Sequence, residues 1–257
     1  MQIIINRRSK ILFLLFLVIV FFYFWHSPEL QQFLEDRDDF KIDKTKSNNV
    51  FEKVGEKISY DVMLGKVRVG QAQYHHLRKT DLQGIPVHLI TFETQAVRFR
   101  DRETIYCDAE TFLPLLVERK ISQLITPEKI KEVYDQKNYT LTITHKRFTQ
   151  EVDVIRKDGP IHNSILLPYF LRKEPELKPG WSFEANLPQG KYKIKLSRIE
   201  EIEVPAGRFK AFYLESEPSK IKIWISADEK KVPLKLEGTG SIGYKLLMRE
   251  YMPPEKK

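Results

Sequence analysis

Histidines near one predicted hairpin could carry metal chemistry. His75, His76 and His88 are close enough in sequence to approach one ion. Adjacent residues of a strand face opposite sides, however, so only one of His75 and His76 can join His88. The sequence has no H-E-x-x-H, no C-x-x-C and no carboxylates at ligand spacing. We therefore predict no metal site and no cofactor.

The single cysteine, Cys107, could act as a nucleophile only with a base beside it. His88 and His145 are the candidates, but nothing in the spacing brings either of them close. A lone cysteine is more often a small buried core residue, and we interpret Cys107 in that way.

Carboxylates on one predicted strand could perform general acid and base catalysis. Asp101, Glu103 and Asp108 are candidates for glycoside cleavage, and Asp101 and Glu103 share a face of a regular strand. Because arginines at 98, 100 and 102 interleave with them, we interpret them as solvated cross-strand ion pairs. We predict no catalytic residues and a protein that is not an enzyme. A buried cluster of carboxylates or histidines in a cleft would favour the third-ranked hypothesis, a hydrolase acting on glycan or lipid.

Lysines on two predicted strands could form one basic outer face. The candidates are Lys191, Lys193, Lys195, Lys220 and Lys222. A solvated sheet face requires polar residues at these alternate positions, and edge lysines discourage aggregation. The functional alternative is attraction to anionic phospholipid heads or acidic polysaccharide. Trp224 interrupts this face, where it could stack on a sugar, touch lipid or pack over lysine stems.

The elements that position these residues are predicted to be strands. Tyr192, Ile194 and Leu196 alternate with lysines, and similar alternation recurs from Phe51 onward. Short polar turns separate the segments at intervals of about eight to twelve residues, without intervening helices. The sequence therefore predicts an all-β, mainly antiparallel fold: a curved meandering sheet or open half-barrel.

One segment has helical rather than strand spacing. Between Ile161 and Arg172 the apolar residues recur at helical intervals, and we expect Pro168 to interrupt or bend the helix. A single short helix would cover one mouth or face of the curved sheet. Four residues beneath or near this lid are the predicted ligand contacts: Leu166, Tyr169, Phe170 and Trp224.

The N-terminal part of the chain contains an unbroken apolar run, Ile11 to Trp25. Three basic residues precede it: Arg7, Arg8 and Lys10. A bilayer core requires about twenty apolar residues, and a run of this length also suits a signal peptide. Because no small residues follow the run, we predict an uncleaved signal anchor, a single transmembrane helix with the remaining chain outside the cytoplasm. A cleaved signal is the alternative.

The predicted organisation therefore has three parts. Residues 1–28 are a signal anchor or transmembrane segment, residues 29–50 a polar tether, and residues 51–257 an antiparallel β-domain. The membrane is a predicted partner through residues 11–25.

Composition excludes several classes. With 42% hydrophobic and 30% charged residues, the 257-residue chain is too apolar to be disordered. The net charge of +8 does not identify a nucleic-acid binder, and we predict no nucleic-acid partner. One cysteine cannot form a disulfide within the chain.

Five short motifs, in order, resemble a bacterial exported family known only as domain of unknown function three-one-zero-eight. They are the hairpin at 54–72, the turn at 108–114, the helix and turn at 167–180, the glycine turn at 204–209 and the terminal hairpin at 223–235 with Ser241-Ile-Gly243 beyond it. The last hairpin also looks like that of periplasmic lipoprotein-sorting carriers, in which an open half-barrel shelters acyl chains beneath a helix.

The resemblance implies a periplasmic or envelope-associated β-rich domain. Together with the predicted anchor, this predicts a bacterial inner-membrane protein with a single span and its C-terminal domain in the periplasm, or a periplasmic protein if the signal is cleaved. We predict that this domain binds a lipid-like or glycan ligand, or acts in cell-envelope biogenesis. The alternative is a structural scaffold that docks a partner protein through a sheet edge or the basic face. A continuous apolar cavity would favour the carrier, and a tightly filled interior the scaffold.

Overall fold

The computed structural model describes residues 53–254, except 98, 124–126 and 239–243. The predicted anchor and tether lie outside the described residues. Across the described part of the chain, no helix has both the length and the apolar character needed to cross a membrane.

The described residues form a 14-stranded sheet with a short helix, α2, at Leu167–Arg172. The strands of the first half are β1 (Lys57–Leu64), β2 (Val67–Leu82), β3 (Ile85–Ala96), β4 (Phe99–Asp108), β5 (Pro114–Gln123), β6 (Glu128–Asp135), β7 (Thr140–Lys146) and β8 (Gln150–Arg156). After α2 come β9 (Ser182–Leu187), β10 (Gly190–Val204), β11 (Gly207–Glu217), β12 (Ile221–Ser226), β13 (Pro233–Gly238) and β14 (Tyr244–Met252).

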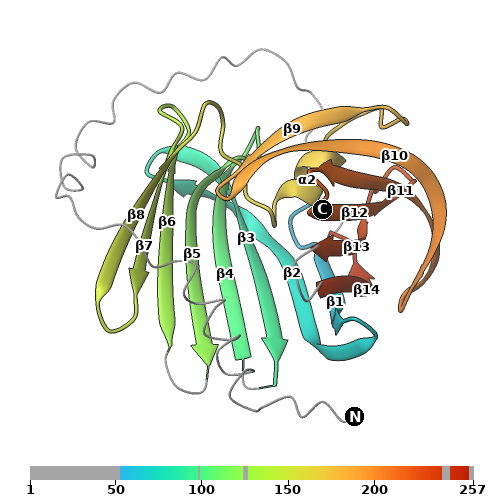
Figure 1. The fold of residues 1–257 in the computed structure, drawn as a ribbon, viewed down its shortest axis with the longest axis horizontal. Coiled ribbons are helices and arrows are strands. Elements are labelled where there is room, and N and C mark those ends of the chain that lie inside the picture. Colours follow the sequence, from blue (N-terminus) through green and yellow to red (C-terminus); the bar gives the residue numbers. More distant parts are fainter. Residues whose placement is uncertain (1–52, 98, 124–126, 239–243, 255–257) are drawn as a thin grey trace, which may run out of the picture.

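The sheet consists of two antiparallel meanders joined in the middle. Strands β1 to β8 follow one another in order, β14 to β9 follow on the other side, and β14 pairs with β1. The sheet curls around α2, which lies on its concave side (Figure 1). The prediction of an all-β antiparallel curved sheet with one short helix is confirmed.

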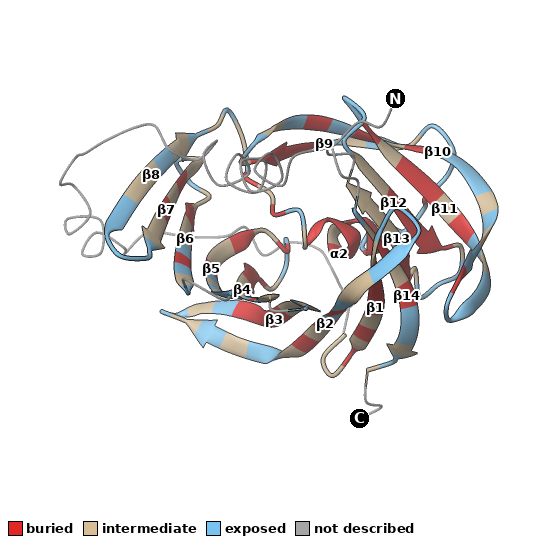
Figure 2. Ribbon diagram, turned by 60° about the horizontal axis from the view of Figure 1, so that its bottom comes forward, coloured by how far each residue is buried: buried red, intermediate tan, exposed pale blue. Residues whose placement is uncertain are grey.

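The two sheet edges, β8 and β9, approach each other at one end. After β8, the N–H of His162 donates to the carbonyl of Asn186 in β9 at 2.7 Å. Lys191 of β10 pairs with Asp158 at 3.3 Å. No strand ladder joins β8 to β9 among the described residues, so the barrel stays open between them (Figure 2).

The proline that was expected to interrupt or bend α2 lies at its start. Pro168 occupies the first turn, where its missing N–H has no intrahelical partner to lose. The helix is buried on two sides. Tyr169 stacks on Tyr74 of β2 and belongs to a core cluster that includes side chains of β1–β7 and of β10–β14. Leu167 and Leu171 belong to a second cluster with side chains of β9–β12. The helix therefore fills the core of the curled sheet.

A buried ion pair holds α2 in this position. Arg172 donates to both carboxylate oxygens of Glu56 at 2.7 Å, and both side chains are fully buried. Tyr169 and Tyr251 also donate to this carboxylate, at 2.9 and 3.0 Å. The Arg172 Nε–H donates to the carbonyl of Lys230 at 3.1 Å. Although burial alone raises the pKa of Glu56, its bonds to Arg172 and Tyr169 outweigh burial and lower it.

Turns predicted from the sequence have the expected chemistry. The Asp108 carboxylate accepts the backbone N–H groups of Glu110 and Thr111 at 3.1 and 2.7 Å. Pro114 then begins β5, where a missing donor is tolerated. Gly207 has a φ of 128°, which favours glycine in the turn between β10 and β11.

Replacing Arg172 with methionine should lower the free energy of unfolding by about 3–5 kcal/mol, because the Glu56 carboxylate stays buried without its cation. Adding Glu56→Gln should recover part of this loss. Urea unfolding of the full chain measures both effects, with the exposed Arg208→Met as a control of little consequence. If Arg172→Met alone were as stable as the wild type, this would contradict the role assigned to the pair.

Candidate functional site

The predicted ligand contacts on α2 are mostly core residues. Leu166 is 2% exposed and Tyr169 is fully buried, with its ring stacked on Tyr74 at 4.3 Å between centroids. Phe170 is half-buried and stacks on Phe183 of β9 at 4.9 Å. Leu166 and Tyr169 thus fix the helix, while Phe170 alone of the three reaches the surface.

Trp224 lies on the lysine-bearing face, as its alternation predicts, but it is covered. Its Nε1–H donates to Glu200 at 2.7 Å, and the Lys235 ammonium lies 4.0 Å from the ring centroid. Tyr213 packs beside it at 4.8 Å. With 6% exposure, Trp224 has the packing role weighed for it above.

The predicted basic face carries interleaved carboxylates. Lys191 pairs with Asp158 and Glu184, and Lys195 with Glu217. Lys222 lies opposite Glu215 and Glu237 in the ladders. Lys193 and Lys220 are exposed. These five lysines therefore belong to a mixed surface of both charges.

His76, His88 and Cys107 are inside the core. His76 Nε2 lies 2.9 Å from His88 Nδ1, whereas His75 points to the other face, as strand alternation requires. Within the described ranges, no group of three potential ligand residues could hold a metal ion. Cys107 is fully buried beside the His88 carbonyl, and burial raises the pKa of its thiol.

Asp101 and Glu103 lie on the concave face rather than in solvent. They lie on the same face of β4 as Ile105 and Cys107, which pack in the same core as Tyr169. Neighbouring strands add charged residues to this face. We call the whole set the inner charged cluster: Asp101, Glu103, Arg119, Glu128, Glu132 and His145. Asp101 and Glu103 do form cross-strand contacts with an arginine, as predicted. The predicted solvated position is wrong, because the arginine is Arg119, which points inward from β5.

Arg119 is the centre of this cluster. Its Nε–H lies 2.9 and 3.0 Å from the two oxygens of Asp101, and its Nη2 also contacts that carboxylate. Glu103 lies 3.6 Å from the same Nε. Further along the face, His145 Nδ1 is 3.1 Å from Glu128. These side chains keep 11% to 32% of their surface exposed, so solvent reaches the cluster.

The cluster shifts the protonation of its own carboxylates. Burial raises the pKa of Glu103 to about 7, with Asp101 and Glu132 adding to the shift and Arg119 opposing it. Burial also raises the pKa of Glu132, against a hydrogen bond of 2.5 Å from Tyr134. Near neutral pH, the Glu103 carboxyl is therefore partly protonated, next to the Asp101 carboxyl that pairs with Arg119.

Sequence reasoning missed Arg119, Glu128 and Glu132, and it considered His145 only as a base for Cys107. A signal was present: each lies in the same strand phase as buried apolar neighbours, as Glu132 does between Ile130 and Tyr134. When several consecutive strands each have a charged residue at an inward-facing position, the pattern indicates a polar cluster on the inner face of the sheet.

The variant Glu103→Gln should be more stable than the wild type at pH 8. The pKa of Glu103 is about 7 in the folded protein and 4.5 as its ordinary value. The folded state thus retains a proton that the unfolded chain releases, and wild-type stability falls as the pH rises from about 4.5 to 7. We expect an advantage of at most about 3 kcal/mol at pH 8 that vanishes near pH 4. Thermal unfolding across this range measures it.

The outward-facing Glu118→Gln on the neighbouring strand β5 is the matched control. A stability difference between Glu103→Gln and the wild type that does not change with pH would contradict the assignment.

Two solved structures resemble the fold. One is the β-barrel-like DUF1849 protein of Brucella abortus, with 8% identity and a TM-score of 0.49 over 79% of this chain and 99% of that one. The other is a candidate exported protein of Bacteroides fragilis with a YmcC-like fold, with 8% identity and a TM-score of 0.33 over 78% and 96%. A search of curated proteins finds no significant match.

The family comparison matches most of the chain. The model of the family described as protein of unknown function DUF3108 aligns with residues 59–249, from β1 to β14. The resemblance drawn from the five motifs is confirmed, and the chain belongs to the DUF3108 family.

Proposed function

We propose that this chain is an extracytoplasmic binding domain that holds a ligand on the inner charged cluster without catalysing a reaction. The observation that supports this most is the cluster itself. Charged side chains of four adjacent strands, β4 to β7, occupy a concave, partly accessible face where an all-apolar core would be more stable.

The chemistry of the cluster favours a hydroxyl-rich ligand such as a glycan. Its carboxylates accept hydrogen bonds from hydroxyl groups, and Arg119 and His145 can donate them. Ile121 and Ile130 lie between the charged residues and offer apolar contact to the carbon face of a sugar ring. The surplus of carboxylates disfavours a phosphate headgroup.

A lipid-like ligand is the second possibility. The concave face next to α2 is filled, since Ile105, Val117 and Leu141 are fully buried there. Space for an acyl chain beneath the helix, as in a sorting carrier, is therefore not supported. A lipid-like ligand would have to bind through its polar part at the cluster.

The scaffold hypothesis rests on the sheet edges. Strand β8 is an edge strand with Val154 at 55% exposure, and a partner strand could pair with it. The mixed charges around Lys191 and Lys195 give less support to docking through a basic face.

Hydrolysis is favoured by one specific observation, the raised pKa of Glu103 beside Asp101, which Arg119 holds by charge and hydrogen bonds. Glycosidases use a carboxyl of raised pKa as the general acid, near a second carboxyl. The cluster therefore contains the residue types of an acid and a base, and the test below separates binding from cleavage.

Saturation-transfer NMR with muropeptides and neutral envelope oligosaccharides tests the binding proposal on the purified full chain. We expect binding of at least one sugar, weakened by about tenfold or more in Glu128→Gln/Glu132→Gln, because each charged hydrogen bond contributes about 1.5–3 kcal/mol. The exposed Lys193→Gln is the matched control.

The same mixtures, analysed by mass spectrometry after long incubation, should contain intact sugars. Binding that the double variant leaves unchanged would contradict the site. Cleavage that Glu103→Gln abolishes would replace the binding proposal with the hydrolase.

A further inference from the structure

We propose that one end of the curved sheet docks onto an anionic phospholipid bilayer. In an antiparallel meander, alternate turns lie at the same end. The turns β1–β2, β3–β4 and β7–β8 therefore share one end of the sheet, the lower end in Figure 1. We call it the hairpin end. This surface lies outside the inner charged cluster and is independent of the ligand proposed above.

Apolar side chains protrude from the hairpin end. Val67, Val97 and Phe148 are 65%, 86% and 87% exposed, each at a different turn. Leu64 and Tyr244, which face each other in the β1–β14 ladder, are also exposed there. Scattered exposed apolar residues are ordinary, but three at turn tips of the same end of the sheet form a set.

Behind the tips, four cations face each other across adjacent strands on the outer side. In the ladders, Arg102 lies opposite Lys120, Lys120 opposite Lys129, and Lys129 opposite Lys146. All four are exposed, and none forms an ion pair with another described residue. Like charges directly opposite each other destabilise a sheet. An anionic surface that covers this row would remove that repulsion.

Carboxylates near the row do not neutralise it. Glu93 lies opposite Arg102 in the ladder, but its ion pair is with Arg100 at 2.8 Å. Glu118, the next outward residue of β5, lies one row further from the turns, opposite Lys131. The cationic row therefore stays available to solvent-borne anions.

The spacing of tips and cations fits the depth of a membrane interface. Lys146 is two residues from Phe148, and Arg102 is five from Val97, which at about 3.3 Å per residue gives roughly 7–17 Å. Apolar tips can thus enter the acyl boundary while long cationic side chains reach the phosphate groups.

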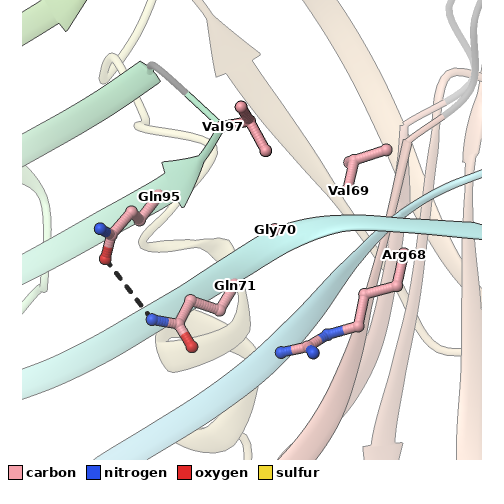
Figure 3. A pocket seen from close by; sticks show the side chains of 6 residues that line it. All are labelled: Arg68, Val69, Gly70, Gln71, Gln95 and Val97. Carbon is pink, nitrogen blue, oxygen red and sulfur yellow. Dashed lines mark hydrogen bonds between the residues drawn. The ribbon is translucent and has the colours of Figure 1, made fainter.

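A hollow of about 300 Å³ also lies at this end, between the β1–β2 and β3–β4 turns (Figure 3). Its lining is Arg68, Val69, Gly70, Gln71, Gln95 and Val97. In Figure 3, Val69 and Val97 extend to one side of β2, and Arg68, which pairs with Asp61 at 2.8 Å, extends to the other. The hollow therefore adds apolar contact beside the Val97 tip, and the cationic row supplies the charge.

A bilayer fits these features better than an acidic protein does. The apolar tips are separate and form no contiguous patch of the kind that a protein interface buries. A fluid bilayer accepts separate side chains and offers anions along the whole row. Strand β1 begins at the opposite end, but the roughly thirty residues between the predicted anchor and β1 can span about 100 Å, far more than a strand.

An environment-sensitive fluorophore on a single added cysteine tests this in the full chain reconstituted into vesicles. Buried Cys107 does not compete for the label. Labels at Val97→Cys and Phe148→Cys should shift to the blue and be quenched by spin-labelled lipid in phosphatidylglycerol-containing vesicles. A label at Asn138→Cys, in the turn between β6 and β7 at the opposite end, should show neither effect.

The triple variant Lys120→Gln/Lys129→Gln/Lys146→Gln should lower the docked fraction of the Phe148→Cys chain by about tenfold or more. The matched control is Lys191→Gln/Lys193→Gln/Lys220→Gln, which removes the same charge elsewhere. Three outcomes would each overturn the proposal: no quenching at Val97→Cys and Phe148→Cys, equal quenching at Asn138→Cys, or equal quenching in pure phosphatidylcholine.

Discussion

The buried pair of Glu56 and Arg172 is the interaction on which the arrangement of the sheet around its helix depends. It joins the segment before β1 to the helix between the two meanders, and Tyr251 adds the last strand. Two charges without water require good geometry to offset their desolvation. A bidentate arginine satisfies that requirement in one orientation of α2, in which Tyr169 stacks on Tyr74 of β2 and Leu171 packs in the cluster of β9–β12.

Because α2 fills the adjacent core, the accessible part of the concave face lies on β4 to β7. There the inward-facing positions of the strands include charged residues. Arg119 offsets the burial of Asp101, while Glu103 is neutralised instead, through its raised pKa. Two features therefore limit the region that can bind a ligand. Helix α2 covers the neighbouring part of the concave face, and the inward residues of β4 to β7 are charged instead of apolar.

Local features of the fold could be predicted from the sequence because they depend on near neighbours. The alternation around Ile194 and the turn after Asp108 are examples. The site could not be predicted in the same way. The burial of Tyr169 follows from Glu56, more than a hundred residues away, and that of Asp101 from Arg119 on another strand. The alternation of apolar and polar residues along a strand predicts which face a residue occupies. It does not predict which residue lies opposite on the neighbouring strand.

The pairing of β1 with β14 has a consequence for folding. The first and last strands of the described residues meet in the middle of the sheet, so the contact order is high and this ladder can close only after β14 has been synthesised. Until then, β1 is an open edge beside a meander that is otherwise able to form. A nascent chain that has not yet reached β14 therefore exposes an edge to which other strands can add, and it is prone to aggregation until β14 pairs with β1.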